Sequence, residues 1–149
     1  MKLLLTQELG RLAKWLRILG FDTEYTREEK FSKVILEALK EDRVIITKRK
    51  KIYEHPGVKF IKVNSDSYKE QLKEILSFLK DYIKEEKKFT RCNICNTQIK
   101  EIEKEKVKDK VPEYVFITQK KFYFCPKCNK IYWQGSHWQK VEELLKEVL

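Results

Sequence analysis

The sequence contains no long hydrophobic run. Its apolar stretches are far shorter than the about 20 residues that a membrane-spanning helix needs. The opening run Met1–Leu5 resembles the start of a signal peptide, but polar residues 6–8 follow where an apolar segment would have to continue. We therefore expect neither a membrane span nor a secretion signal, and we expect a cytoplasmic location.

Internal repeats are also missing, and the composition argues against a disordered chain. Hydrophobic residues make up 42% and aromatic residues 12% of the 149 residues, which is typical of a packed globule. A chain of this length suits one domain, or one domain with a small module, and buries about 68–70% of its unfolded surface. It can therefore fold without disulfide bonds.

Acidic residues are few compared with basic ones. There are 33 Lys and Arg residues against 23 Asp and Glu residues, which gives a net charge of +10. A basic surface attracts polyanions such as RNA, DNA or anionic lipid. The alternative is a lysine-rich surface of the kind found in thermophilic proteins. Of the two, we favour contact with nucleic acid.

Strands and helices alternate along residues 1–83. Helical spacing of apolar residues predicts helices ending at Gly20, beginning at Phe31, and following the Ser67/Glu70 capping-box pair. Four short segments are predicted to be strands, at residues 2–6, 22–25, 44–47 and 58–63; the first and third of them contain continuous apolar runs. This alternation predicts an α/β fold with a small parallel sheet, whose carboxyl strand ends include Thr6 and residues 47–49.

The composition changes after Ile83, so we place a domain boundary there. Residues 84–88 are charged and are typical of a solvated linker. Residues 84–149 then form a cysteine module, with residues 100–110 as an exposed charged insertion, and a final helix with apolar positions from Val141 to Val148. We expect Tyr132 and Trp133 to lie in the small core of this module.

All four cysteines fall into two Cys-x-x-Cys pairs, which are Cys92/Cys95 and Cys125/Cys128. Two intervening residues let a tight turn aim both sulfurs at one ion, and two such turns complete a tetrahedral shell. Two disulfides or two redox pairs are the alternative, which a cytosolic setting disfavours. The pattern predicts a zinc ribbon whose zinc is structural, because four thiolates leave no open coordination position.

The run from Leu9 to Thr23 resembles the opening of the mut-seven C-terminal ribonuclease domain family. The runs 90–96 and 125–137, with Val111-Pro112 between them, are similar to that family's two zinc knuckles and insertion. The resemblance covers nearly the whole chain. It implies a three-layer PIN-like nuclease fold fused to a zinc ribbon, with RNA as the substrate class.

The resemblance also implies a catalytic metal site that this sequence does not reproduce. PIN-like nucleases hold Mg²⁺ or Mn²⁺ with carboxylates at strand ends, and the ion activates the attacking water. The positions that correspond to these acids are Thr6, Phe31 and Arg49. We therefore expect no catalytic residues here, and Arg49 and Lys48 are expected to repel a metal and to contact an RNA phosphate directly.

Three functions remain open. The first is an RNA-binding protein without nuclease activity. The second is a ribonuclease that holds Mg²⁺ or Mn²⁺ with relocated acids, for which the candidates are Glu8, Asp22, Glu28, Glu29 and Asp42. The third is a protein-interaction adaptor whose charge is incidental. The oligomeric state is not predicted.

Basic and aromatic residues on two parts of the chain are the candidate RNA contacts. One face of the first helix carries Arg11, Lys14, Trp15 and Arg17, and Trp15 either stacks on a base or packs against the zinc module. The second group comprises Lys120, Lys121, His137 and Trp138. Together with Lys48 and Arg49, these are the predicted RNA-binding residues.

Overall fold

The computed structural model describes residues 1–52 and 54–149, without the side chains of Ser136 and His137. The chain divides into two compact units, residues 1–96 with Val148 and residues 97–147 with Leu149. The predicted functional boundary after Ile83 stays a prediction.

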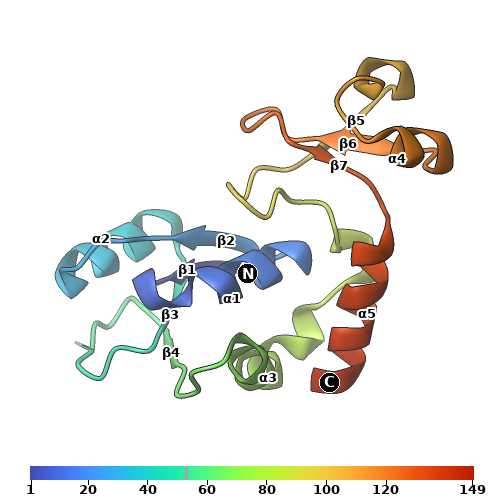
Figure 1. Cartoon of the computed structure of the whole chain (residues 1–149). Coiled ribbons are helices and arrows are strands. Elements are labelled where there is room, and N and C mark those ends of the chain that lie inside the picture. Colours follow the sequence, from blue (N-terminus) through green and yellow to red (C-terminus); the bar gives the residue numbers. More distant parts are fainter. Residues whose placement is uncertain (53) are drawn as a thin grey trace. The chain divides into compact units, whose positions relative to one another are not determined.

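The first unit is built on a four-stranded parallel sheet, as the alternation of elements predicts (Figure 1). Its strands are β1 (Lys2–Leu5), β2 (Asp22–Tyr25), β3 (Val44–Thr47) and β4 (Phe60–Lys62), in the spatial order β2-β1-β3-β4. The chain therefore moves from β1 to one side of the sheet and then crosses to the other. This reversal between β1 and β3 is the place where α/β sheets bind ligands, outside the carboxyl strand ends.

The central strands are apolar because both of their faces are buried. Leu3, Leu5 and Ile45 have no exposed surface. Leu4 pairs with Ile45, so successive residues of β1 point to opposite faces and are buried on both. The α/β fold with helices flanking a parallel sheet is thus confirmed.

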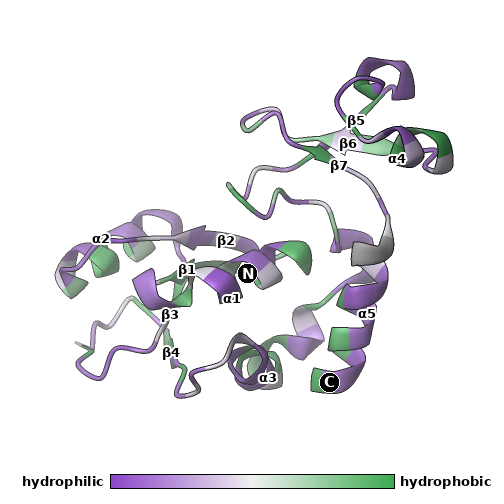
Figure 2. Ribbon diagram, in the orientation of Figure 1, coloured by the Kyte–Doolittle hydropathy of each residue, from purple (hydrophilic) through white to green (hydrophobic). Residues whose placement is uncertain are grey.

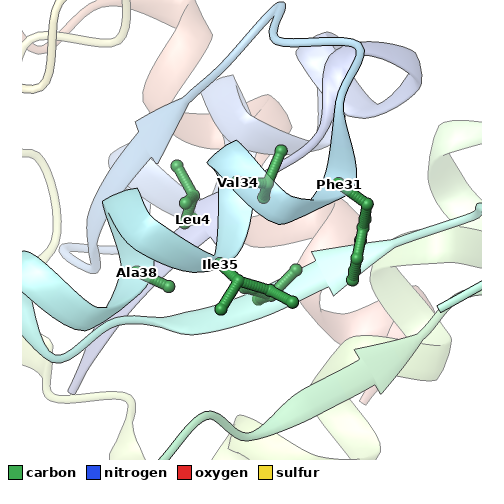
Figure 3. Close-up of a cluster of buried hydrophobic side chains, with 6 residues drawn as sticks. Leu4, Phe31, Val34, Ile35 and Ala38 are labelled. Atoms are coloured by element: carbon green, nitrogen blue, oxygen red, sulfur yellow. The ribbon is translucent and has the colours of Figure 1, made fainter. Parts of the chain in front are cut away.

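Three helices follow the strands, namely α1 (Gly10–Ile18), α2 (Phe31–Glu41) and α3 (Tyr68–Leu79). Apolar and polar residues alternate along α2 with helical spacing (Figure 2). Its apolar side packs on one face of the sheet in a cluster shown in Figure 3, made of Leu4, Phe31, Val34, Ile35, Ala38 and Ile45. The predicted cap of α3 is present, since the Ser67 side chain accepts the backbone N–H of Glu70 at 3.3 Å.

Short 3₁₀ turns connect these elements. They span Gln7–Leu9, Lys80–Tyr82 and Glu85–Lys87. The last of them leads into the first cysteine pair, and the backbone N–H of Phe89 donates to the carbonyl of Ile18 at 2.8 Å. The segment before the knuckle is therefore fixed to the end of α1.

The second unit contains a three-stranded antiparallel sheet in the order β5-β6-β7 (Figure 1). The strands are β5 (Lys100–Ile102), β6 (Phe122–Phe124) and β7 (Ile131–Tyr132). The other elements are a 3₁₀ turn at Lys104–Val107 and the helices α4 (Glu113–Thr118) and α5 (Ser136–Val148). The final helix is longer than its apolar positions predicted.

Two predictions for this unit hold only in part. Residues 100–110 are not simply an exposed insertion, because β5 pairs with β6 and Val107 is fully buried with Val115 and Phe122. Trp133 packs against this core as predicted, but Tyr132 is not part of it. Strand alternation explains the difference, since Ile131 faces the core and its neighbour Tyr132 therefore faces the other way.

No helix in the described part of the chain is long and apolar enough to cross a membrane.

Candidate functional site

The four cysteines lie together, as their spacing predicts. The Sγ atoms of Cys92, Cys95, Cys125 and Cys128 all lie within 4.8 Å of one another. Tetrahedral zinc with Zn–S bonds of about 2.3 Å would place its sulfurs about 3.8 Å apart, so the donor set and its spacing fit such an ion. Among the described residues, this is the one place where three or more potential metal ligands lie close together.

Both knuckles have the same backbone design. Asn96 and Asn129 each follow the first cysteine of their pair by four residues, with positive φ angles of 73° and 61°. Their backbone N–H groups donate to the carbonyls of Cys92 (2.9 Å) and Cys125 (2.8 Å). Asparagine tolerates this left-handed conformation, which closes each turn and directs both of its sulfurs to one side.

The first knuckle is fixed to the edge strand β2 by a buried arginine on α1. Arg17 donates from Nε to the carbonyl of Thr23 (2.8 Å) and from Nη1 to the carbonyls of Asn93 (3.2 Å) and Ile94 (2.9 Å). Burial lowers the pKa of Arg17, although Glu24 and the nearby cysteines oppose that effect. Arg17 thus joins helix, strand and knuckle, and its contact with RNA stays a prediction that this geometry does not favour.

Asn96 completes the connection from the knuckle side. Its Oδ1 accepts the backbone N–H of Thr23 (2.9 Å), and its Nδ2 donates to Asp22 (2.7 Å) and Glu24 (3.2 Å). An edge strand exposes unpaired backbone groups, so the Asn96 side chain pairs one that would otherwise face solvent. The metal knuckle therefore also covers part of β2.

Asp22 is held as an ion beneath this contact. Arg43, whose side chain is 4% exposed, donates to Asp22 at 2.8 Å and to Glu41 at 3.1 Å. Burial alone would raise the pKa of Asp22, but the hydrogen bonds from Arg43 and Asn96 and the nearby charges lower it below the ordinary value. Asp22 is thus engaged in ion pairs, and these contacts do not favour it as a relocated catalytic acid.

The carboxyl edge of the sheet carries two threonines and one glutamate at the reversal of strand order. The Thr6 hydroxyl donates to Glu8 at 2.5 Å, and the Thr47 hydroxyl lies 2.8 Å from Thr6 and 3.2 Å from Glu8. The backbone N–H of Lys48 adds a third donor to the same carboxylate at 2.8 Å. Burial would raise the pKa of Glu8, but these hydrogen bonds lower it, so the carboxylate is charged at neutral pH.

The three positions that the resemblance assigns to the family's acids lie near one another at this edge. Arg49 donates its backbone N–H to the Thr47 hydroxyl at 3.1 Å, and Thr47 contacts Thr6. The Arg49 guanidinium lies 5.8 Å from the centre of the Phe31 ring. Phe31 is the first residue of α2, and its side chain is buried in the core between α2 and the sheet. A threonine pair, a core aromatic ring and an arginine thus occupy the place where the resemblance predicts a metal.

Both predicted phosphate-binding cations at this edge already have protein partners. Arg49 donates to the carbonyls of Glu29 (3.0 Å) and Glu28 (2.6 Å), and Lys48 pairs with Asp66. A guanidinium has five N–H donors, so two hydrogen bonds do not exhaust it. Lys48 is the more easily recruited, because the Asp66 side chain that holds it is 97% exposed.

The helix face predicted to contact RNA is built around a tyrosine that the sequence did not single out. The Arg11 guanidinium lies 4.0 Å from the centre of the Tyr68 ring, and Trp15 stacks on Tyr68 with ring centres 6.1 Å apart. Trp15 therefore packs against α3, and its contact with a base stays a prediction. Lys14, on the same helix, is exposed.

The sequence of the chain matches a known protein family. The model of the Mut7-C RNAse domain matches residues 1–145. The chain belongs to the Mut7-C RNAse domain family. No curated protein and no solved structure matched it. The resemblance of the knuckles and of the first helix to the Mut7-C family is thereby confirmed across nearly the whole chain.

The second group of predicted RNA contacts lies in the second unit. Lys120 and Lys121 are exposed and lead from α4 into β6, and Trp138 lies in the first turns of α5. The side chain of His137 lies outside the described part of the chain. Whether these residues contact RNA stays a prediction.

Sequence reasoning missed three residues of this arrangement. Asn96 was hidden because its role depends on a side chain meeting a strand 73 residues earlier. Arg43, which precedes β3, and Tyr68, which begins α3, belong to no motif in the sequence and were not singled out. The signal that was available is Asn96 itself, which stands in the first knuckle where Asn129 stands in the second.

Proposed function

We propose that this Mut7-C family member is an RNA-binding protein whose sheet edge binds RNA without a catalytic metal. The observation that carries the proposal is the contact chain Thr6–Thr47–Arg49 at the reversal of strand order, with Phe31 beside it. None of these four side chains is a carboxylate. The family provides the RNA-related context.

Electrostatics supports the loss of the metal. Two unit charges about 4 Å apart interact by roughly 4 kcal/mol at an effective dielectric constant near 20, and a divalent ion doubles this value. At Arg49 the interaction with a metal is repulsive, whereas an acid would attract it. The same charge attracts an RNA phosphate, which a guanidinium binds with paired hydrogen bonds.

The positive charge of the chain favours a polyanion as the partner. The net charge is +10, and the exposed or partly exposed cations Arg11, Lys14, Lys48 and Arg49 all belong to the first unit. Arg11 is near the sheet edge along the chain, because only the 3₁₀ turn Gln7–Leu9 separates Thr6, at the carboxyl end of β1, from the start of α1. RNA phosphates are expected to follow this edge.

We also propose that the metal held by the four cysteines is zinc and that its role is structural. Four thiolates match the preference of zinc and leave no position for a substrate. Binding energy in such sites is folding energy, because the unfolded chain does not hold the ligands together. The cytoplasmic location expected from the sequence fits this proposal, since reduced thiols are the rule there.

A ribonuclease with relocated acids is the second candidate, and Glu8 is the observation that favours it. Glu8 is an ionised carboxylate at the reversal of strand order. A metal site needs several ligands, however, and among the described residues such ligands gather at the four cysteines and not around Glu8. The third candidate, a protein-interaction adaptor, has no specific contact in its favour.

The deciding experiment incubates the zinc-loaded chain with unpaired and hairpin RNAs in Mn²⁺, Mg²⁺ or EDTA. We expect intact RNA in every condition, with binding that weakens steeply as salt increases. Cleavage that requires Mn²⁺ or Mg²⁺ and disappears in Glu8→Gln would refute the proposal in favour of the nuclease. Absence of binding to either RNA at low salt would leave the adaptor as the better explanation. Glu86→Gln, an exposed acid outside this edge, is the matched control for a contaminating nuclease.

A further inference from the structure

The small sheet of the second unit has one face in the core and one face that the core does not use. Phe122 is fully buried with Val107 and Val115, and Ile102 and Ile131 pack against them. These strand residues all lie on one side, because Phe122 pairs with Ile102 and Phe124 pairs with Ile131. Strand alternation therefore places Tyr123 and Tyr132 on the opposite side.

Tyr123 and Tyr132 are direct cross-strand neighbours on that side. They are paired in the register of β6 and β7, and both side chains are partly exposed. Directly opposite residues have Cβ atoms about 4.5–5.5 Å apart, so the two side chains are neighbours on this side of the sheet. We call this surface, Tyr123 with Tyr132, the tyrosine face.

A lysine lies on the tyrosine face at each end. Lys121 precedes Tyr123 by two residues and Lys130 precedes Tyr132 by two residues, so each shares a side with its tyrosine. The Lys130 ammonium lies 5.0 Å from the centre of the Tyr132 ring. Because β6 and β7 are antiparallel, the two lysines lie at opposite ends of the tyrosine pair. The Cα atom of each lysine is about 7 Å along the chain from the Cα atom of its tyrosine.

We propose that the tyrosine face binds unpaired RNA, with a base stacked on each ring and with Lys121 and Lys130 contacting the flanking phosphates. This inference rests on the proposed RNA-binding function and adds the class of RNA, namely single-stranded segments. Aromatic rings on a sheet stack unpaired bases, whereas bases inside a duplex are already stacked and do not present their faces.

Charge is the reason to commit to RNA as the occupant rather than to another protein. Lysine is depleted in the central region of protein–protein interfaces, where aromatic residues gather. Here the aromatic pair lies directly between two lysines. Glu101 on β5 is opposite Tyr123 in the register, and its negative charge repels phosphate. The phosphates are therefore expected on the other side of Tyr123, along β6 and β7.

The test compares Tyr123→Ala with Tyr114→Ala in the full-length, zinc-loaded chain. Tyr114 is the matched control because it is a tyrosine of the same unit, is 70% exposed, and lies on α4. The probe is a short unpaired RNA that carries 2-aminopurine, whose fluorescence falls when it stacks on an aromatic ring. A blunt RNA duplex of the same length is the comparison ligand.

We expect Tyr123→Ala to weaken binding of the unpaired RNA about tenfold and to remove the fluorescence change, since stacking is a large part of such binding. Duplex binding should change by less than about twofold, and Tyr114→Ala should leave both ligands unchanged. Tyr123→Phe retains the ring and should restore the native affinity, whereas Tyr123→Leu should not. The ratio of zinc to protein in each variant shows whether the ribbon is intact.

The outcomes separate this inference from the function on which it rests. If the native chain binds RNA but Tyr123→Ala and Tyr123→Leu bind it as tightly as the native chain does, the inference is wrong and the RNA-binding proposal stands. If the native chain binds neither ligand, both are wrong. If Tyr123→Ala changes only the molecular mass in solution, the tyrosine face is an interface between copies and not an RNA site.

Discussion

The Thr6 and Thr47 hydroxyls lie 2.8 Å apart and join the carboxyl ends of the two central strands. Each hydroxyl has a single proton, and the Glu8 carboxylate accepts the proton of Thr6 at 2.5 Å. The site is thus a closed hydrogen-bonded group with one negative charge, flanked by Lys48 and Arg49. Threonine, and not an acid, thus follows the last residue of β1 and ends β3.

The first prediction concerns acid. The pKa values of Glu8 and Asp22 in the folded chain are below their ordinary values of 4.5 and 3.8. The unfolded chain therefore binds more protons, and stability is present above these ordinary values and is lost as pH falls through the lower folded ones. We expect the urea midpoint to be constant from neutral pH to about pH 5 and to fall steeply below about pH 4.

Asp22→Asn and Glu8→Gln test the source of that fall. Each variant should be less stable at neutral pH, because it leaves buried or partly buried donors such as those of Arg43 without a charged acceptor. Each should also show a shallower loss of stability in acid. Glu86→Gln, which changes an exposed acid, should behave like the native chain. An unchanged slope in both site variants would contradict the assignment.

The second prediction distinguishes the contribution of the Asn96 side chain to stability from that of its backbone conformation. Glycine adopts the φ of 73° without steric strain, so the main loss in Asn96→Gly is that of the hydrogen bonds between the Asn96 side chain and Thr23, Asp22 and Glu24. We expect a loss of about 1–3 kcal/mol in the free energy of unfolding, the usual cost of leaving such groups unsatisfied.

Asn96→Ala should cost about 1 kcal/mol more than Asn96→Gly, because alanine also strains a left-handed backbone. Asn129→Gly is the matched control, since it makes the same change at φ 61° in the second knuckle. Urea unfolding of all three zinc-loaded variants provides the comparison. Equal stability of Asn96→Gly and the native chain would show that the Asn96 amide contributes nothing.

The third prediction follows from the same contact and concerns removal of the metal. The Thr23 amide donates to Asn96, which closes the first knuckle with a hydrogen bond to Cys92. Chelation should loosen the knuckle and expose this edge of β2. We expect amide exchange at Thr23 to accelerate about tenfold or more, the result of losing roughly 1.4 kcal/mol of protection.

Ile46 provides the internal control for exchange. It lies on the central strand β3, fully buried, and should keep its protection when the metal is removed. Cys95→Ser should reproduce the effect without a chelator. Equal acceleration at both amides would mean that the whole first unit unfolds with the metal, and no change at either would mean that the knuckle holds its place without it.

The sequence predicted the elements of the first unit well because each has a strong local signal. The strands Asp22–Tyr25 and Val44–Thr47 have the predicted bounds, and Ser67 caps α3 as its pairing with Glu70 predicts. The four cysteines were equally clear, since their spacing reflects the geometry of the metal. Local patterns thus gave both the sheet and the metal centre.

The parts that escaped prediction depend on contacts between distant residues. Val107 has charged neighbours on both sides, so local hydrophobicity placed it in an exposed insertion although it is fully buried. Arg17 looked like a solvent-facing cation, but it reaches carbonyls 76 and 77 residues later in the knuckle. No periodicity along the chain records such a contact.

The last prediction tests whether the carboxyl edge of the sheet binds phosphate. Each phosphate contact to a single strand contributes about 0.7 to the slope of log affinity against log salt. Lys48→Gln should therefore weaken RNA binding and reduce this slope by about 0.7. Arg49→Gln should do the same, although it also removes the hydrogen bonds to the carbonyls of Glu28 and Glu29.

Lys40→Gln is the matched control. It removes the same charge from the last turn of α2, away from the carboxyl edge, and should leave the slope unchanged. Equal reductions in Lys40→Gln and Lys48→Gln would show that RNA responds to net charge and not to this edge.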